Sequence, residues 1–202
     1  MIDMEANRAR FEAELRKTGR KGVENALAEL DRLGFFTAPA STRFHGSEPG
    51  GLAAHSLNVY DEARIIWATQ AKLRPDIAER IGEDSVAIVA LLHDICKAEV
   101  YRQEIKHRKN ANGKWEDYTG YGVDYSDFPV GHGEKSVIRL LQWGVELRDD
   151  EILAIRWHMG GFDLPFQSAE AKACYGAAGE KSPLVSILCA ADGLASHVIE
   201  AN

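Results

Sequence analysis

The segment 86–97 constrains the chain most, because seven consecutive apolar residues lead directly into His93 and Asp94. A segment that is apolar on every side is predicted to lie in the interior of the fold, here as a helix that Asp84 or Ser85 caps and that ends beyond Lys97. An unpaired carboxylate is very unfavourable in such a place. The protein must therefore neutralise Asp94 with a buried ion pair, a hydrogen-bonded His–Asp pair or a metal ion.

Length and composition indicate one soluble domain, residues 1–202, with enough chain for a core and an interior site. The net charge of −7 disfavours a surface that wraps nucleic acid. No apolar stretch has the length of a membrane span, and charges alternate near the N-terminus, so we expect a cytoplasmic protein with no membrane partner. The three cysteines form no CxxC motif and are expected to be reduced. Nothing in the sequence indicates the oligomeric state.

Apolar periodicity predicts an all-α fold with one small β-hairpin inserted near residues 103–123, around the pair Asn112-Gly113. An N-terminal helical extension occupies residues 1–34. Besides the buried helix, the predicted helices cover residues 3–17, 23–33, 52–71, 75–81, 131–143, 151–159, 169–175 and 184–200.

Six ionisable residues lie inside or at the ends of these apolar helices, where such side chains are scarce: His55, His93, Asp94, His132, His158 and Asp192. Taken singly, each is more often a hydrogen-bonded core residue, but metal ligation explains them together. Imidazoles and carboxylates without thiolates are typical ligands of Mn, Fe, Co, Ni or Zn. Six ligands suit two adjacent metals that share a carboxylate and bind a bridging hydroxide, an arrangement that promotes phosphoryl displacement.

The order His55, His93-Asp94, Asp192 resembles the HD-domain superfamily of metal-dependent phosphohydrolases, and residues 91–97 resemble its signature segment. Residues 50–56 are similar to the segment around the first histidine in a bacterial branch that includes HD-type 3′-to-5′ exoribonucleases. The resemblance implies an HD-domain helical bundle with a metal-binding core at residues 50–197.

The additional histidines resemble those of the binuclear members of this superfamily. That resemblance implies that Asp94 bridges two metals, with Fe or Mn preferred and Co, Ni or Zn as alternatives. The first metal would be held by His55, His93, Asp94 and Asp192, and the second by Asp94, His132 and His158. Phosphodiesterases of the HD-GYP type share this pattern, but their Gly-Tyr-Pro extension is absent after His158, which disfavours cyclic-di-GMP hydrolysis.

Several charged residues near these positions are predicted to bind substrate. Lys97 follows Asp94 by three residues and is expected to direct its ammonium group at a phosphate or a leaving oxygen, with an ion pair at a helix end as the alternative. Further candidates for substrate contacts are Arg43, His45, Lys135 and Arg156. For Arg43 and His45, stabilisation of their loop is an equal alternative.

Glu134 and three tyrosines each have two possible roles, and two further histidines have no predicted role at the site. Glu134 either orients a ligand imidazole or caps a helix. Tyr118, Tyr121 and Tyr125 either stack on a base or form cross-strand pairs, and cross-strand pairing is the commoner role. His107 and His197 lie outside the ligand pattern.

The sequence therefore predicts a metal-dependent phosphohydrolase in which Asp94 and Lys97 are catalytic. Its expected substrate is a phosphorylated small molecule or a nucleic-acid end, cleaved at a phosphomonoester or phosphodiester bond. Myo-inositol oxygenase and a related phosphonate oxygenase use the same ligand pattern, so a mixed-valent di-iron oxygenase is the main alternative. A nucleotide-binding module without catalytic activity is a further alternative.

Overall fold

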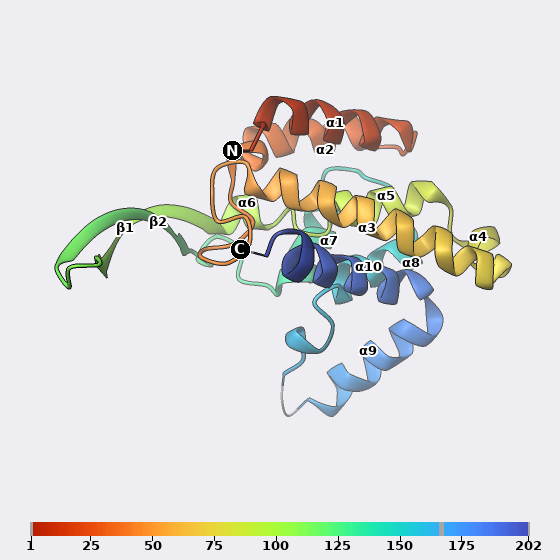
Figure 1. Cartoon of the computed structure of the whole chain (residues 1–202). Coiled ribbons are helices and arrows are strands. Elements are labelled where there is room, and N and C mark those ends of the chain that lie inside the picture. Colours follow the sequence, from red (N-terminus) through yellow and green to blue (C-terminus); the bar gives the residue numbers. More distant parts are fainter. Residues whose placement is uncertain (1, 166–167, 202) are drawn as a thin grey trace.

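The computed structural model describes residues 2–165 and 168–201 and confirms an all-α fold with one two-stranded sheet (Figure 1). The elements are α1 (Met4–Lys17), α2 (Val23–Arg32), η1 (Phe35–Thr37), α3 (Gly51–Leu73), α4 (Pro75–Arg80), α5 (Glu83–Leu92), α6 (Lys97–Val100), β1 (Tyr101–Lys109), β2 (Trp115–Val123), α7 (His132–Gln142), α8 (Asp149–Trp157), η2 (Gly160–Asp163), α9 (Ala169–Lys181), α10 (Pro183–Leu194) and η3 (Ala195–Ile199).

Helix α5 lies at the centre of the bundle because it is apolar on all sides. Every residue from Ser85 to Leu92 is buried, and α5 packs against α1, α3, α8 and α10. The N-terminal helices α1 and α2 cover one side of the bundle, and α9 lies on the opposite side (Figure 1). One cluster of buried apolar residues runs from Phe11 to Ala195.

The buried helix differs from its prediction at both ends. It ends at Leu92, and a tight turn, closed by a 3.0 Å hydrogen bond from the Lys97 N–H to the Asp94 carbonyl, leads into α6. It begins after Gly82 without a side-chain cap, because the side chains of Asp84 and Ser85 bind elsewhere: Asp84 accepts from Arg20 at 2.8 Å and Ser85 donates to Glu151 at 2.7 Å.

The C-terminal part also departs from the predicted bounds. Helix α9 continues to Lys181 rather than ending at residue 175, and α10 passes into a π-helical turn, η3. The domain limits and the 1–34 and 50–197 subdivision stay predictions, and the end points 1 and 202 lie outside the described residues. Within the described ranges, no single helix is both long and apolar enough to cross a membrane. One pair of helices, Ala169–Lys181 with Pro183–Ile199, has the required length and composition when taken together, but it is strongly bent.

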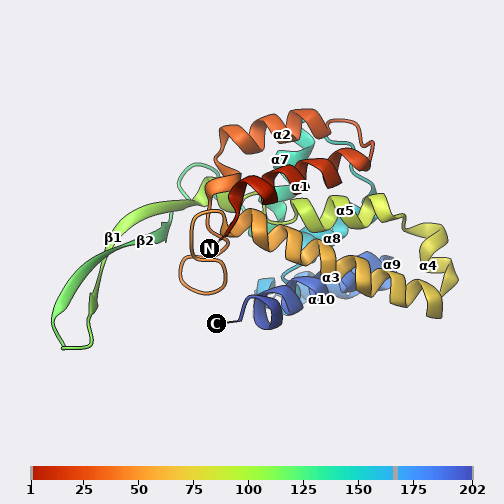
Figure 2. The same ribbon diagram turned by 45° about the horizontal axis from the view of Figure 1, so that its top comes forward.

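The predicted hairpin is confirmed and begins two residues earlier than residue 103. Strands β1 and β2 pair in antiparallel register from Tyr101 opposite Val123 to Lys109 opposite Trp115. Asn110 closes the turn by accepting the backbone N–H groups of Asn112 and Lys114, and Gly113 adopts a φ of 73° that favours glycine. The hairpin projects from the bundle as a long ribbon (Figures 1 and 2).

Candidate metal centre

Asp94 lies in the turn after α5, is only 1% exposed, and is surrounded by four imidazoles from four parts of the chain. Its Oδ1 atom is 2.5 Å from Nε2 of His132 and 3.4 Å from Nε2 of His158. Its Oδ2 atom is 3.4 Å from Nε2 of His93 and 3.7 Å from Nε2 of His55. Each carboxylate oxygen therefore faces one pair of imidazoles, as a carboxylate shared by two metals would.

Asp192 reaches the same cluster from α10. Its Oδ1 atom lies 3.2 Å from Nε2 of His55, and its carboxylate also groups with His93 and His158, with all ligand atoms within 4.8 Å of one another. The fold thus brings together all six residues that the sequence singled out as ligands. They come from α3, the turn after α5, the start of α7, the end of α8 and α10.

In three of the imidazoles, the Nδ1 atom, which is the ring nitrogen farther from Asp94, lies within hydrogen-bond distance of an acceptor. Nδ1 of His93 donates to the Ala90 carbonyl at 2.9 Å, Nδ1 of His158 donates to the Ile155 carbonyl at 2.7 Å, and Nδ1 of His55 lies 3.1 Å from the Glu200 carboxylate. Such bonds fix the tautomer that turns the Nε2 lone pair inward, as metal-binding histidines require.

The Nε2 atoms of these three histidines face Asp94, and their lack of hydrogen-bond partners among the described residues indicates that the residues fit a metal ion. Nε2 of His55, of His93 and of His158 are all buried without a hydrogen-bond partner in the part of the chain that the structure describes. Asp192 lies near Nε2 of His55, but the two groups are not aligned for a hydrogen bond. Buried polar atoms rarely lack partners. Converging nitrogens and carboxylate oxygens without a thiolate form the donor set of a transition-metal site.

Charges within the cluster keep Asp94 ionised. Burial alone would raise the pKa of Asp94, but Lys97, His93 and His132 hold it well below its usual range. The Lys97 ammonium lies 2.5 Å from Oδ2 of Asp94, and this carboxylate keeps the pKa of Lys97 above its ordinary value despite burial. An ion pair to Lys97 and the neighbouring imidazoles therefore neutralise the Asp94 carboxylate.

A family model described as "HD domain" matches residues 52–196. The chain belongs to the HD-domain family. No curated protein and no solved structure matches it. HD domains are typically metal-dependent phosphohydrolases that bind divalent metals, and the buried His and Asp clusters of this chain are able to hold such ions.

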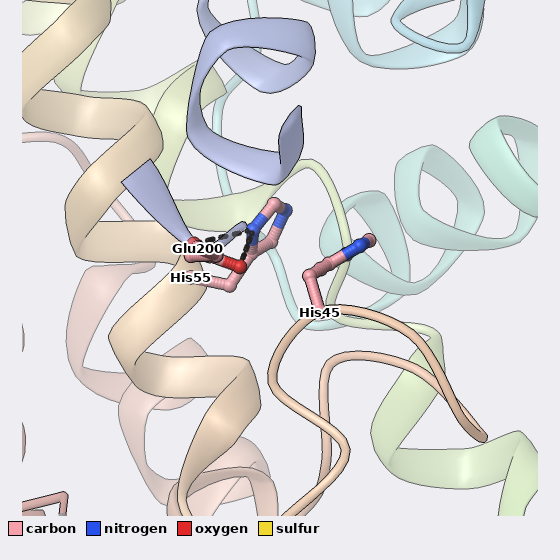
Figure 3. A group of neighbouring side chains, drawn as sticks. All are labelled: His45, His55 and Glu200. Atoms are coloured by element: carbon pink, nitrogen blue, oxygen red, sulfur yellow. Dashed lines mark hydrogen bonds and ion pairs between the residues drawn. The ribbon is translucent and has the colours of Figure 1, made fainter. Parts of the chain in front are cut away.

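A cavity of about 390 Å³ opens beside the metal centre of this HD domain. His45, Lys97, His158 and Asp192 contribute to its wall, together with the glycines and the aromatic ring of η2. His45 comes from the loop before α3, and its ring lies 4.9 Å from that of His55, centroid to centroid (Figure 3). Burial, with the charges of His55 and Lys97, lowers the pKa of His45 to about 4, so this imidazole is neutral near pH 7.

Three other residues predicted to bind substrate do not line this cavity. Arg43 is exposed, with its guanidinium 5.1 Å from the centre of the Phe44 ring. Lys135 is buried with its ammonium 3.0 Å from the Glu99 carboxylate. Arg156 forms ion pairs with Glu134 at 2.6 Å and with Asp163 at 2.5 Å, so the Glu134 carboxylate contacts a guanidinium. Substrate contacts of Arg43, Lys135 and Arg156 stay predictions.

Two residues that contact the ligand imidazoles were not singled out from the sequence for this role. Glu200 binds His55, and Cys96 has its Sγ atom 3.3 Å from Nδ1 of His132. The spacing of Asp192, Ser196 and Glu200, four residues apart on one helical face, is a signal that points to Glu200. Cys96 gave no comparable signal, because cysteines are common in cores.

Glu200 is expected to strengthen metal binding by orienting His55, since its carboxylate is also fixed by the side-chain amide of Asn58 at 2.9 Å. The substitution Glu200→Gln is therefore expected to weaken metal affinity about 10- to 100-fold. Titration of metal-free protein with Mn²⁺ measures this change. Glu24→Gln is the matched control, because the Glu24 carboxylate is exposed and pairs with Arg16 on the N-terminal helices. Equal affinities of the two variants would contradict the role.

Metal binding is expected to release protons. Burial opposes the charged form of His55, but Asp192 and Glu200 raise its pKa to about 9 in the metal-free protein. A metal must therefore displace this proton at neutral pH, and affinity is expected to rise up to about tenfold per pH unit between about pH 6 and pH 8. Calorimetric titration in two buffers of different ionisation enthalpy counts the released protons. An affinity that does not change with pH would refute this expectation.

Proposed function

We propose that this HD domain hydrolyses a phosphomonoester or phosphodiester bond of a nucleotide or of a nucleic-acid end. The observation that carries the proposal is the position of Asp94, whose two carboxylate oxygens face separate pairs of imidazoles. Two divalent transition metals bound there would supply a bridging hydroxide as nucleophile and Lewis acidity toward phosphoryl oxygens.

These distances support two ligand sets. His55 and His93, which face Oδ2 of Asp94, would hold the first metal with it and with Asp192, whose Oδ1 lies 3.2 Å from Nε2 of His55, while His132 and His158 on the Oδ1 side would hold the second. The nitrogen and oxygen donors favour Fe or Mn, with Co, Ni or Zn as alternatives. Asp94 is the residue on which both sets depend.

Lys97 and His45 are the proposed substrate-binding residues. Lys97 is the only lysine or arginine in the wall of the cavity beside the centre, as far as the described residues go, and its ammonium is suited to a phosphate oxygen or a leaving oxygen. His45 has its Nε2 atom buried without a partner in the described ranges, and it is free to hydrogen-bond to a substrate. Both side chains would orient the substrate and stabilise its charge.

The charge of the cavity supports an anionic substrate. Two divalent metals would outweigh the two ligand carboxylates, Asp94 and Asp192, and Lys97 adds one more positive charge. Such a site attracts and orients phosphate groups.

The direct test is hydrolysis of a generic phosphodiester and of a panel of nucleotides by metal-free protein reloaded with Mn, Fe, Co or Ni. Metal-dependent release of the alcohol or phosphate, lost in Lys97→Met at unchanged metal content, would support the proposal. No hydrolysis with any metal would refute it, and oxygen consumption by anaerobically prepared iron-loaded protein would point to the oxygenase alternative. Lys114→Met is the matched control, because Lys114 lies in the exposed turn of the hairpin.

A further inference from the structure

Among the described residues, the strands of the β1–β2 hairpin pack mainly against each other and not against the helices. It projects from the bundle next to α6 (Figures 1 and 2). A two-stranded ribbon alone in water is at best marginally stable, and an exposed apolar face usually marks a contact surface.

One face of this ribbon carries its exposed apolar side chains. The register places Ile105 opposite Thr119 and Tyr101 opposite Val123, with Trp115 on the same side, because residues two apart and directly paired residues share a face. Ile105 and Trp115 are each 70% exposed, and Val123 is 45% exposed. We call the aromatic, aliphatic and threonine residues of this face the arm face: Tyr101, Ile105, Trp115, Thr119, Tyr121 and Val123. Gln103, His107, Lys109 and Asp117 lie on the same side of the ribbon.

The hairpin also differs in charge from the rest of the chain. Residues 101–123 contain five lysines or arginines and three carboxylates, a net charge of +2, whereas the other residues contain 19 and 28, a net charge of −9. Three of the five cations, Arg102, Lys109 and Lys114, form no ion pair with a carboxylate within the described ranges. A basic arm on an acidic body is complementary to the body of another copy of the same chain.

The same charges disfavour nucleic acid as the occupant. Arg108 is paired with Glu116 at 2.7 Å, so this cation is already neutralised, and the His107 ring is bonded to Asp117 at 2.6 Å. The acidic body would repel a phosphate backbone that extends beyond the arm.

The area is sufficient for a dimer in which the two arms are exchanged. Nine paired residues span about 30 Å, and a face about 10 Å wide offers roughly 300 Å². Two arms, each covering an equal area of the other body, would bury about 1,200 Å², the lower end of the range for stable interfaces.

We propose that the arm face docks on the acidic body of a second copy of the chain, and that two chains exchange arms in a symmetric dimer. Hydrophobic contact of Ile105 and Trp115 provides the stabilisation, and the opposite net charges of arm and body guide the association. This dimer is tested separately from the catalytic proposal, because Ile105 and Trp115, the two residues that the test changes, line neither the cavity nor the ligand cluster, whereas Tyr101 at the base of the arm lies near Lys97 and Asp94.

The test is the molar mass in solution by light scattering after size exclusion, over a range of protein concentrations and salt concentrations. We expect a dimer for wild type that weakens with added salt, and a monomer for Ile105→Glu and for Trp115→Glu with unchanged circular dichroism. Ile65→Glu is the matched control, because Ile65 is 61% exposed on α3 and the same charge is introduced there. It should remain dimeric.

Two results would overturn the proposal. One is a wild-type protein that stays monomeric up to its highest soluble concentration, and the other is a pair of Glu variants that stay dimeric. If the monomeric wild type also binds a single-stranded RNA oligonucleotide in a gel-shift assay and Ile105→Glu loses this binding, the arm is assigned to nucleic acid instead.

Discussion

Replacement of Asp94 by asparagine is expected to reduce bound metal from the proposed two ions per chain to one or none and to lower hydrolysis by at least about 10³-fold. Both proposed ligand sets use this carboxylate, because one oxygen faces His132 and His158 and the other faces His93 and His55. Loss of one strong electrostatic contact to a transition state already costs about 10²- to 10³-fold in rate. Elemental analysis and the phosphodiester assay measure the two effects.

The control for this variant is Asp31→Asn, which makes the same chemical change at an exposed position on α2, where Asp31 pairs with Arg8. It should keep wild-type metal content and activity. Circular dichroism tests whether Asp94→Asn still folds, which matters because Asp94 also neutralises Lys97. Full metal content and full activity of a folded Asp94→Asn protein would contradict the bridging role.

Replacement of Arg20 by alanine is expected to lower the free energy of unfolding by about 3–5 kcal/mol, because it leaves a buried carboxylate without its cation. Arg20 lies between α1 and α2, and its guanidinium donates to both oxygens of Glu151, at 2.6 and 2.8 Å, and to Asp84 at 2.8 Å. The Glu151 side chain is fully buried on α8. Thermal unfolding of the metal-free protein should show a decrease in Tm of about 10 °C.

Two comparisons make this second prediction specific. Arg8→Ala removes exposed ion pairs with Asp31 and Glu12 and a contact with the Phe36 ring, and should cost only about 1–2 kcal/mol. The double variant Arg20→Met/Glu151→Met should lose less stability than the two single variants summed, because it removes both buried charges together. A cost below about 1 kcal/mol for Arg20→Ala would show that the pair does not anchor the N-terminal helices.

The fold class and the ligand cluster were predictable because they depend on residue type and spacing. Apolar periodicity located the helices, and the pair Asn112-Gly113 located the hairpin. The six candidate ligands were recognisable because each is an ionisable residue in apolar surroundings, and the fold does bring them together. Their roles as ligands stay predictions that the experiments above address.

Other features depend on long-range contacts that no local pattern contains. The buried helix ends at Leu92 because the chain turns there, and its first residues bind Arg20 and Glu151 instead of capping their own helix. The ion pairs of Lys135 and Arg156 likewise depend on the packing. Lys135 on α7 pairs with Glu99 on α6, and Arg156 on α8 pairs with Asp163 in η2. A charged residue one turn from a ligand therefore pairs with whichever carboxylate the packing brings near.

The spread of the six candidate ligands along the chain has a consequence for folding. The ligands lie between positions 55 and 192 and come from five different parts of the fold. An unfolded chain holds them too far apart to chelate one ion, so metals would bind almost entirely to the native state. Each site saturated at 100 times its Kd would then stabilise the protein by about 2.7 kcal/mol. A chelator would therefore lower the free energy of unfolding of this protein without contacting the folded chain.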